Sequence, residues 1–269
     1  MSGRGAGAAF TAPQVVSRGL RSSWLRALAG GAAIYALVTV AALDTQNIHL
    51  VPAVLVLGAL LVPVTFVVYV FERLSVQAAV LPALAICFAV GGSIGVAAAS
   101  VLEYQTLRDL GALPMLAVGL IEESVKLAVP LWLLARKRFR APADGVLFGV
   151  AAGMGFAALE TMGYGLVALI QSGGRIGAAE EVLLVRGLLS PVGHAAWTGL
   201  VCAALWRARA SIGLARPWVA VIAAFAVAVA LHSLWDSTDS IPARVAIGLL
   251  SGTLLAAQIR QVRRDSAAG

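Results

Sequence analysis

Long apolar runs follow one another along nearly the whole chain, and short polar segments separate them. A helix needs about 20 consecutive apolar residues to cross the hydrocarbon core of a bilayer. The pattern therefore predicts an all-α fold, a polytopic helical membrane protein with about eight transmembrane helices. We expect these helices at residues 25–43, 50–71, 77–101, 112–134, 145–170, 182–206, 217–234 and 241–259.

The polar ends of the chain set the expected domain boundaries. Residues 1–23 are rich in Gly, Ala, Ser and Arg without an apolar period, which predicts a disordered basic tail. Residues 24–262 are expected to form one transmembrane domain, and residues 263–269 a second short cytoplasmic tail.

Composition and charge support a membrane location. Hydrophobic residues make up 60% of the chain and charged residues 12%, with a net charge of +7. The arginines cluster in alternate segments between the spans, as the positive-inside rule requires, so nucleic acid is not an expected partner. We expect a multi-pass protein of the cell membrane, with the lipid bilayer as a partner and both termini in the cytoplasm. The segments at residues 44, 103–109, 172–181 and 236–239 are then expected outside.

Several familiar kinds of hydrolytic or metal site are absent from the sequence. Cys87 and Cys202 lie in apolar runs without a CxxC or Cys/His spacing, which indicates packing rather than a disulfide or a zinc knuckle. No serine lies in a GxSxG elbow, neither cysteine has a spaced base, and there is no HExxH. The sequence therefore does not support a serine or cysteine nucleophile.

Two acids and a lysine lie in the middle of the apolar run 112–134. Each ionisable side chain at the centre of a span costs roughly 2.5 to 3.5 kcal/mol on insertion scales, which indicates a polar interior or a function. Glu122 and Lys126 are four residues apart, and Glu123 and Lys126 are three apart, so Lys126 can neutralise either carboxylate. We expect the other intramembrane polar groups to face this helix.

The later spans contribute the remaining polar candidates. Glu160 has no cation three or four residues away in its own span, so we expect it to point at the helix that carries the glutamate pair. Pro191 lacks the N–H that closes a helical turn, so the backbone should open beside His194. His232 and Asp236 are four residues apart, so the carboxylate can orient the imidazole. Glycines at positions 145, 149 and 153 share one face and predict close helix packing.

Glutamates and histidines together suit two kinds of chemistry. They can activate a water by general-base catalysis, or they can coordinate a metal ion, and both routes hydrolyse a peptide bond. The candidate ligands are Glu122, His194 and His232, and Zn²⁺ stays open as an option. No cofactor is favoured, because the Lys126 ammonium beside Glu122 would disfavour a dication. A proton- or ion-coupled transporter is the alternative, although no inverted repeat is evident.

The polar residues fall into four ordered blocks that resemble the PrsW family of intramembrane proteases. This family belongs with the CAAX prenyl endopeptidases and bacteriocin-immunity proteins in one glutamate-dependent superfamily. The resemblance covers the core 113–236. The blocks are E-E-x-x-K at residues 122–126, D-G followed by G-M-G-F-A-A-L-E at 144–160, P-V-G-H at 191–194, and L-H-S-L-W-D at 231–236.

The resemblance implies an intramembrane peptidase of the glutamic type, with metal dependence left open. It implies that Glu122 activates the attacking water while Glu123 and Lys126 set its charge, and that the other catalytic and supporting groups come from the later blocks. The catalytic candidates are Glu122, Glu123, Glu160, His194 and His232, and the supporting candidates are Lys126, Asp236, Arg186 and Phe156.

The resemblance also implies a substrate class and leaves a third alternative. The substrates would be transmembrane or membrane-anchored proteins, such as anti-sigma factors, cut on the extracytoplasmic side in a signalling cascade. Thr161 and Asp236 stand where many relatives have asparagine, which puts a direct oxyanion-donor role of Asp236 in doubt. A catalytically inactive immunity or binding protein of the same fold is the third alternative.

Overall fold

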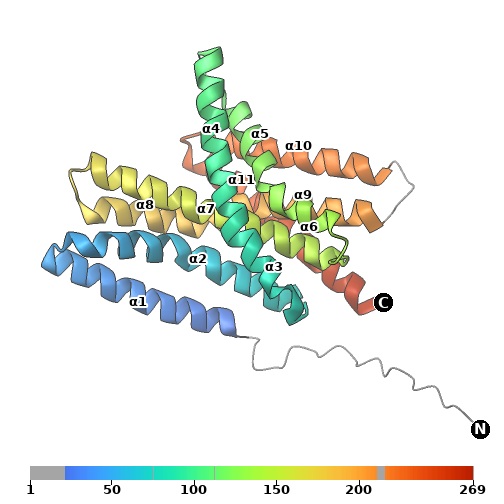
Figure 1. The fold of residues 1–269 in the computed structure, drawn as a ribbon, viewed down its shortest axis with the longest axis horizontal. Helices are drawn as coiled ribbons and strands as arrows, with labels where there is room; N and C mark the ends of the chain where they lie inside the picture. Colours follow the sequence, from blue (N-terminus) through green and yellow to red (C-terminus); the bar gives the residue numbers. More distant parts are fainter. Residues whose placement is uncertain (1–21, 75, 112, 211–215, 269) are drawn as a thin grey trace, which may run out of the picture.

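The computed structural model describes residues 22–74, 76–111, 113–210 and 216–268, and these ranges contain helices and turns without a strand. The predicted all-α fold is confirmed (Figure 1). Most of the expected N-terminal tail lies outside the described residues. The helices are α1 (Ser23–Thr45), α2 (Val51–Leu74), α3 (Leu81–Ile86), α4 (Gly92–Leu110), α5 (Met115–Lys126), α6 (Ala128–Ala135), α7 (Pro142–Gln171), α8 (Ile176–Leu189), α9 (His194–Ala210), α10 (Arg216–Asp236) and α11 (Ile241–Ala268).

Seven helical segments among the described residues are long and apolar enough to cross a membrane. They are α1, α2, α4 with the short helices before it, α7, α8 together with α9, α10 and α11. Two expected boundaries were wrong: α4 continues to Leu110 where we expected a loop at 103–109, and α8 begins at Ile176 inside the expected loop 172–181.

The expected fourth span, 112–134, consists of two shorter helices, α5 and α6, which meet at Leu127. The cause is Pro130, which has no N–H to donate to the carbonyl of Lys126 four residues earlier. Leu127 instead donates to Ser124, three residues back, as in a tight final turn. The expectation of one continuous helix was therefore wrong, and the break directly follows the lysine of the polar cluster.

Helix α7 lies at the centre of the bundle. In its most apolar stretch of 18 residues, 83% is buried inside the protein, a larger share than in any of the other six segments. Its glycines pack against α9, as the sequence predicts. A Cβ added to Gly149 would lie 2.6 Å from the carbonyl oxygen of Thr198, and one on Gly145 would lie 2.7 Å from the ring of Trp206. Gly153 lies against the backbone of His194. The small residues thus bring α9 and its histidine close to α7.

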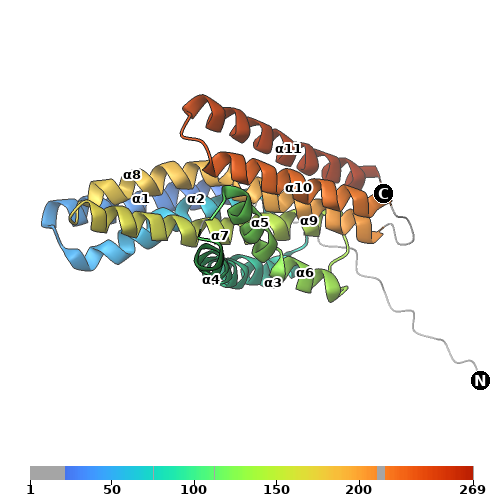
Figure 2. The ribbon, with the colours of Figure 1, turned by 90° about the horizontal axis from the view of Figure 1, so that it is seen from above.

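Helix α4 crosses the other long helices steeply (Figure 1). At the crossing, Gly92 and Gly155 bring the two backbones into contact, and Gly155 also lies against the carbonyl of Phe88. Phe88 belongs to a single π-helical turn, η4 (Cys87–Gly91), which joins α3 to α4. Helix α11 lies along the outside of the bundle beside α10 (Figure 2).

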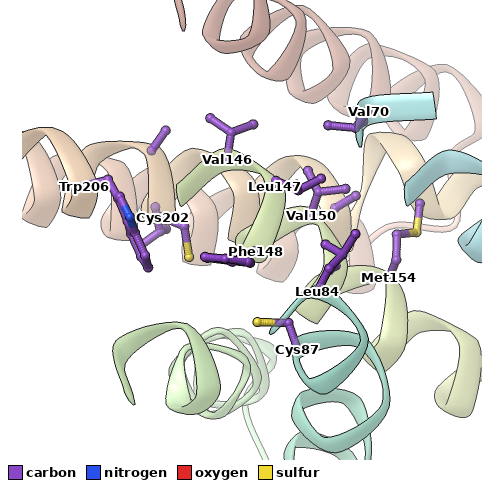
Figure 3. Close-up of a cluster of buried hydrophobic side chains, with 14 of the residues drawn as sticks. Val70, Leu84, Cys87, Val146, Leu147, Phe148, Val150, Met154, Cys202 and Trp206 are labelled. Carbon is purple, nitrogen blue, oxygen red and sulfur yellow. The ribbon is translucent and has the colours of Figure 1, made fainter. Parts of the chain in front are cut away.

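The two cysteines are free and buried in the apolar core, so the packing role expected for them is confirmed. Figure 3 shows Cys87 and Cys202 among large side chains from α2, α3, α7 and α9. Phe148 of α7 lies beside Cys202 in this view, and its ring centroid is 5.9 Å from that of Trp206. This core packs α7 against α9.

Candidate active site

A cavity of about 620 Å³ opens between α4, α5, α7, α8, α9 and α10. Its walls combine apolar side chains with five of the polar residues that the sequence singled out: Glu122, Glu160, Arg186, His194 and Asp236. The polar lining consists of Ser100, Glu103, Glu122, Glu160, Thr161, Tyr164, Arg186, Ser190, His194, Asp236 and Arg244. A polar cavity within a bundle of membrane-spanning length is the arrangement that intramembrane ionisable groups require.

Helix α5 brings three ionisable side chains together beside this cavity, because positions three and four apart lie on one helix face. The Nζ atom of Lys126 is 3.1 Å from Glu122 Oε2 and 2.8 Å from Glu123 Oε1, which confirms the predicted pairing. Glu123 and Lys126 are completely buried, whereas Glu122 lines the cavity and keeps 7% exposure. The two glutamates therefore differ in access to a substrate.

His232 of α10 contacts both glutamates. Its Nδ1 atom lies 2.9 Å from Glu123 Oε1, and its Nε2 atom lies 3.5 Å from Glu122 Oε2. The expected pairing with Asp236 is also present, with 3.2 Å between Nε2 and Oδ2. The imidazole is 2% exposed, and carboxylates on both of its nitrogens fix its orientation.

We expected Glu160 of α7 to point at helix α5, and this prediction was wrong. Its Oε2 atom lies 2.8 Å from Arg186 of α8 and 3.1 Å from His194 Nε2 of α9. Glu160 finds these partners and not α5 because α7 packs closely on α8 and α9. The second nitrogen of His194, Nδ1, lies 2.8 Å from Lys126 Nζ. His194 therefore links the glutamate pair on α5 to the Glu160–Arg186 pair.

The turn before His194 is opened by Pro191, as predicted. Helix α8 ends at Leu189, residues Ser190–Val192 form one 3₁₀ turn, and α9 begins at His194. The Ser190 hydroxyl donates to the Gly187 carbonyl at 2.7 Å, which replaces the N–H that the proline lacks. The break lets His194 project from the first turn of α9 into the cavity.

Aromatic rings enclose the ionisable cluster. The Phe156 ring lies 4.2 Å from the Lys126 ammonium, so this supporting residue stabilises the cation through its π face. Trp197 stacks on His232 with 4.6 Å between ring centroids, and its Nε1 donates to Ser251 of α11 at 2.9 Å. These ring contacts hold the Lys126 and His232 side chains in place and shield them from lipid.

Three residues of the site escaped the sequence analysis. Thr198 donates to Glu123 Oε2 at 3.3 Å, Tyr164 lies under the Arg186 guanidinium at 3.9 Å, and Glu103 lines the cavity from α4. Thr198 is four residues after His194, and Tyr164 is four residues after Glu160. That i, i+4 spacing from a known candidate was the available signal.

The cluster has the donor set of a metal site. Ligand atoms of Glu122, His194 and His232 all lie within 4.8 Å of one another. Two imidazoles and one carboxylate are a ligand set that catalytic zinc accepts. Each histidine also has one nitrogen on a further carboxylate, Glu123 or Glu160, which is how metal-bound histidines are usually oriented. The residues therefore fit a metal ion, although Lys126 contacts two of the three donors here.

Comparison with known proteins gives one match. No curated protein and no solved structure was found to match the chain. The profile of the PrsW family of intramembrane metalloproteases matches residues 46–259, a range that contains every candidate site residue. A match over this much of the sequence shows the relationship. The chain is a multi-pass membrane protein that belongs to the PrsW family of intramembrane metalloproteases.

Proposed function

We propose that the protein hydrolyses a peptide bond in transmembrane or membrane-anchored proteins, with Glu122, His194 and His232 as the hydrolytic centre. The observation that carries this proposal is the convergence of these three side chains, from α5, α9 and α10, with ligand atoms within 4.8 Å of one another. Glu122 and His194 of this group line the polar cavity. The family match favours hydrolysis over the transport alternative.

The two glutamates of α5 are given different roles. Glu122 lines the cavity and can meet a water molecule and a peptide carbonyl, whereas Glu123 is completely buried. Glu123 accepts hydrogen bonds from Lys126 and Thr198 and faces His232 Nδ1, so it orients the other groups. Only Glu122 of the pair is therefore assigned direct contact with the substrate.

Glu122, His194 and His232 would hold a zinc ion, and a bound zinc ion lowers the pKa of its water to about 7 and polarises the peptide carbonyl. Glu123 and Glu160 orient the two imidazoles, and Asp236 lies near the cavity opening with its side chain 32% exposed. The Lys126 contacts are also compatible with a second form of the chemistry, in which Glu122 itself accepts the proton of the water.

The proposed substrates are single-pass membrane proteins such as anti-sigma factors, cut on the extracytoplasmic side of the cell membrane. The distribution of arginines supports this side, because it places the start of α5 outside. Glu122 is seven residues from Met115, about 10 Å along the helix. A cut close to the outer face of a substrate span is therefore within reach.

A comparison of membrane proteomes tests the function. Cells that produce the wild type should accumulate new protein termini in or beside transmembrane segments, and cells that produce Glu122→Gln should lose them by about 10² to 10⁴-fold. The matched control is Glu181→Gln, the same chemical change at an exposed position of α8, which should cleave like the wild type. If wild-type and Glu122→Gln cells contained the same amounts of these new termini at equal levels of the two proteins, the assignment would be overturned.

A further inference from the structure

A second cavity, of about 410 Å³, lies between α2 and α11 on the other side of the Pro191 turn. Its inner part is apolar and includes Phe66 of α2, Val192 of the turn and Leu255 of α11. None of the catalytic candidates lines it. The cavity is therefore a separate feature that the proposed hydrolysis does not explain.

The outer part of this cavity is strongly basic. Arg73 at the end of α2 and Arg260 and Arg263 near the end of α11 all line it. Among the residues that the structure describes, these three guanidinium groups form no ion pair with a carboxylate. The adjacent Glu72 faces α1 instead, where it accepts from the backbone N–H groups of Ser23 and Trp24. Three uncompensated positive charges thus meet at one mouth.

The polarity changes in one direction along the cavity. Gly252 lies at the apolar end and Arg263 at the basic end, and eleven residues of helix separate them by about 16 Å. Arg73 is held at the basic end by the face of Tyr69, with 5.0 Å from its Cζ atom to the ring centroid. The basic end coincides with the predicted cytoplasmic surface of the membrane. The gradient matches a molecule with an anionic head and an apolar tail.

The shape of the cavity favours a single chain over a helix. A volume of 410 Å³ spread over about 16 Å gives a mean cross-section of about 25 Å². A helix with side chains, about 10 Å across, needs about 80 Å². A substrate helix or a second copy of this protein therefore does not fit, whereas a hydrocarbon chain does.

We propose that this cavity binds an anionic phospholipid of the cytoplasmic leaflet. Its phosphate lies among Arg73, Arg260 and Arg263, and one acyl chain extends along α11 to Val192. Basic pockets between membrane helices on the cytoplasmic side bind anionic lipid head groups in this way. Val192 also packs against Gly248 and Gly252 of α11, so the lipid contacts the turn that leads into His194.

The binding test uses purified protein, stripped of lipid in detergent, and native mass spectrometry with phosphatidylglycerol and phosphatidylcholine as probes. The wild type should bind phosphatidylglycerol at least fivefold more tightly than phosphatidylcholine. The triple variant Arg73→Gln, Arg260→Gln, Arg263→Gln should bind it on the order of 100-fold less tightly, at about fivefold per arginine. Its matched control is Arg136→Gln, Arg138→Gln, Arg264→Gln, which removes the same charge from exposed arginines outside the cavity and should stay within twofold.

A second variant keeps the arginines and blocks the apolar end. Ala256→Leu adds side-chain volume to the cavity wall and should lower the affinity for phosphatidylglycerol at least fivefold, and the lipid should raise the unfolding temperature of the wild type but not of this variant. Three results would overturn the proposal: equal binding of the two lipids, wild-type affinity of the triple variant at the cavity, or an equal loss in the control variant. The last result would show attraction by net charge alone.

Discussion

Replacing Lys126 by methionine would show how strongly the buried ion pairs stabilise the fold. Methionine has a similar length but no charge. In the wild type the Lys126 ammonium lies 2.8 Å from Glu123 Oε1 and 3.1 Å from Glu122 Oε2, and it is completely buried. The variant leaves two neighbouring carboxylates without this cation, one of them, Glu123, completely buried.

The expected loss is large because of this burial. Removing one partner of a buried ion pair costs about 3–5 kcal/mol, which is a third or more of the total stability of many domains. The Arg108–Asp109 pair has a similar distance, 3.3 Å, but its side chains are 65% and 64% exposed. Exposed pairs contribute about 0–1 kcal/mol, so Arg108→Met is the matched control.

The assay is the thermal unfolding midpoint of each purified variant in one detergent. Lys126→Met should unfold at a much lower temperature than the wild type, and Arg108→Met close to it. The double variant Lys126→Met, Glu123→Gln removes one of the two orphaned charges, so it should recover part of the loss. A Lys126→Met protein that unfolds at the wild-type temperature, or a double variant that is no better than the single one, would refute the electrostatic reasoning.

Three further predictions concern packing, second-sphere contacts and topology. Gly149→Ala should destabilise the protein by about 1–3 kcal/mol, because the added Cβ would lie 2.6 Å from the carbonyl oxygen of Thr198. Gly163→Ala on the same helix is the control, because a Cβ there meets nothing within 4 Å and should be neutral or stabilising. Equal unfolding midpoints of the two variants would contradict this reasoning. Glu160→Gln should lower zinc affinity by about 10- to 100-fold through the histidine it orients, measured by competition with a chelating dye, and unchanged affinity would argue against that role. A cysteine at Ser172 should react with an impermeant thiol reagent in intact cells and one at Arg138 only after permeabilisation, and the reverse pattern would invert the topology.

The contacts that sequence predicted well are those within one helix. Lys126 with its two glutamates and His232 with Asp236 are three or four residues apart, so helical periodicity alone places them together. The glycines facing α9 follow from the same rule. Such contacts depend only on the helix forming, which the apolar runs made clear.

The contacts that sequence missed lie between helices. Glu160 was expected to face α5, but the rotation of α7 turns it to Arg186 and His194. Glu103 was assigned to a loop, because the charged residues near the end of α4 hid its continuation to Leu110. Helix rotation and the steep crossing of α4 depend on packing at glycines far away in the sequence, which periodicity in one segment does not report.

The most direct measurement of the central claim is the zinc content of the purified protein. The account predicts about one zinc ion per chain in the wild type, and little in a variant that carries Glu122→Ala, His194→Ala and His232→Ala. Glu181→Gln, at the exposed surface of α8, should keep the wild-type content. A wild type that cleaves its substrate at full rate after chelation with no zinc left would contradict the metal site. Zinc retained by the triple variant would place the ion elsewhere.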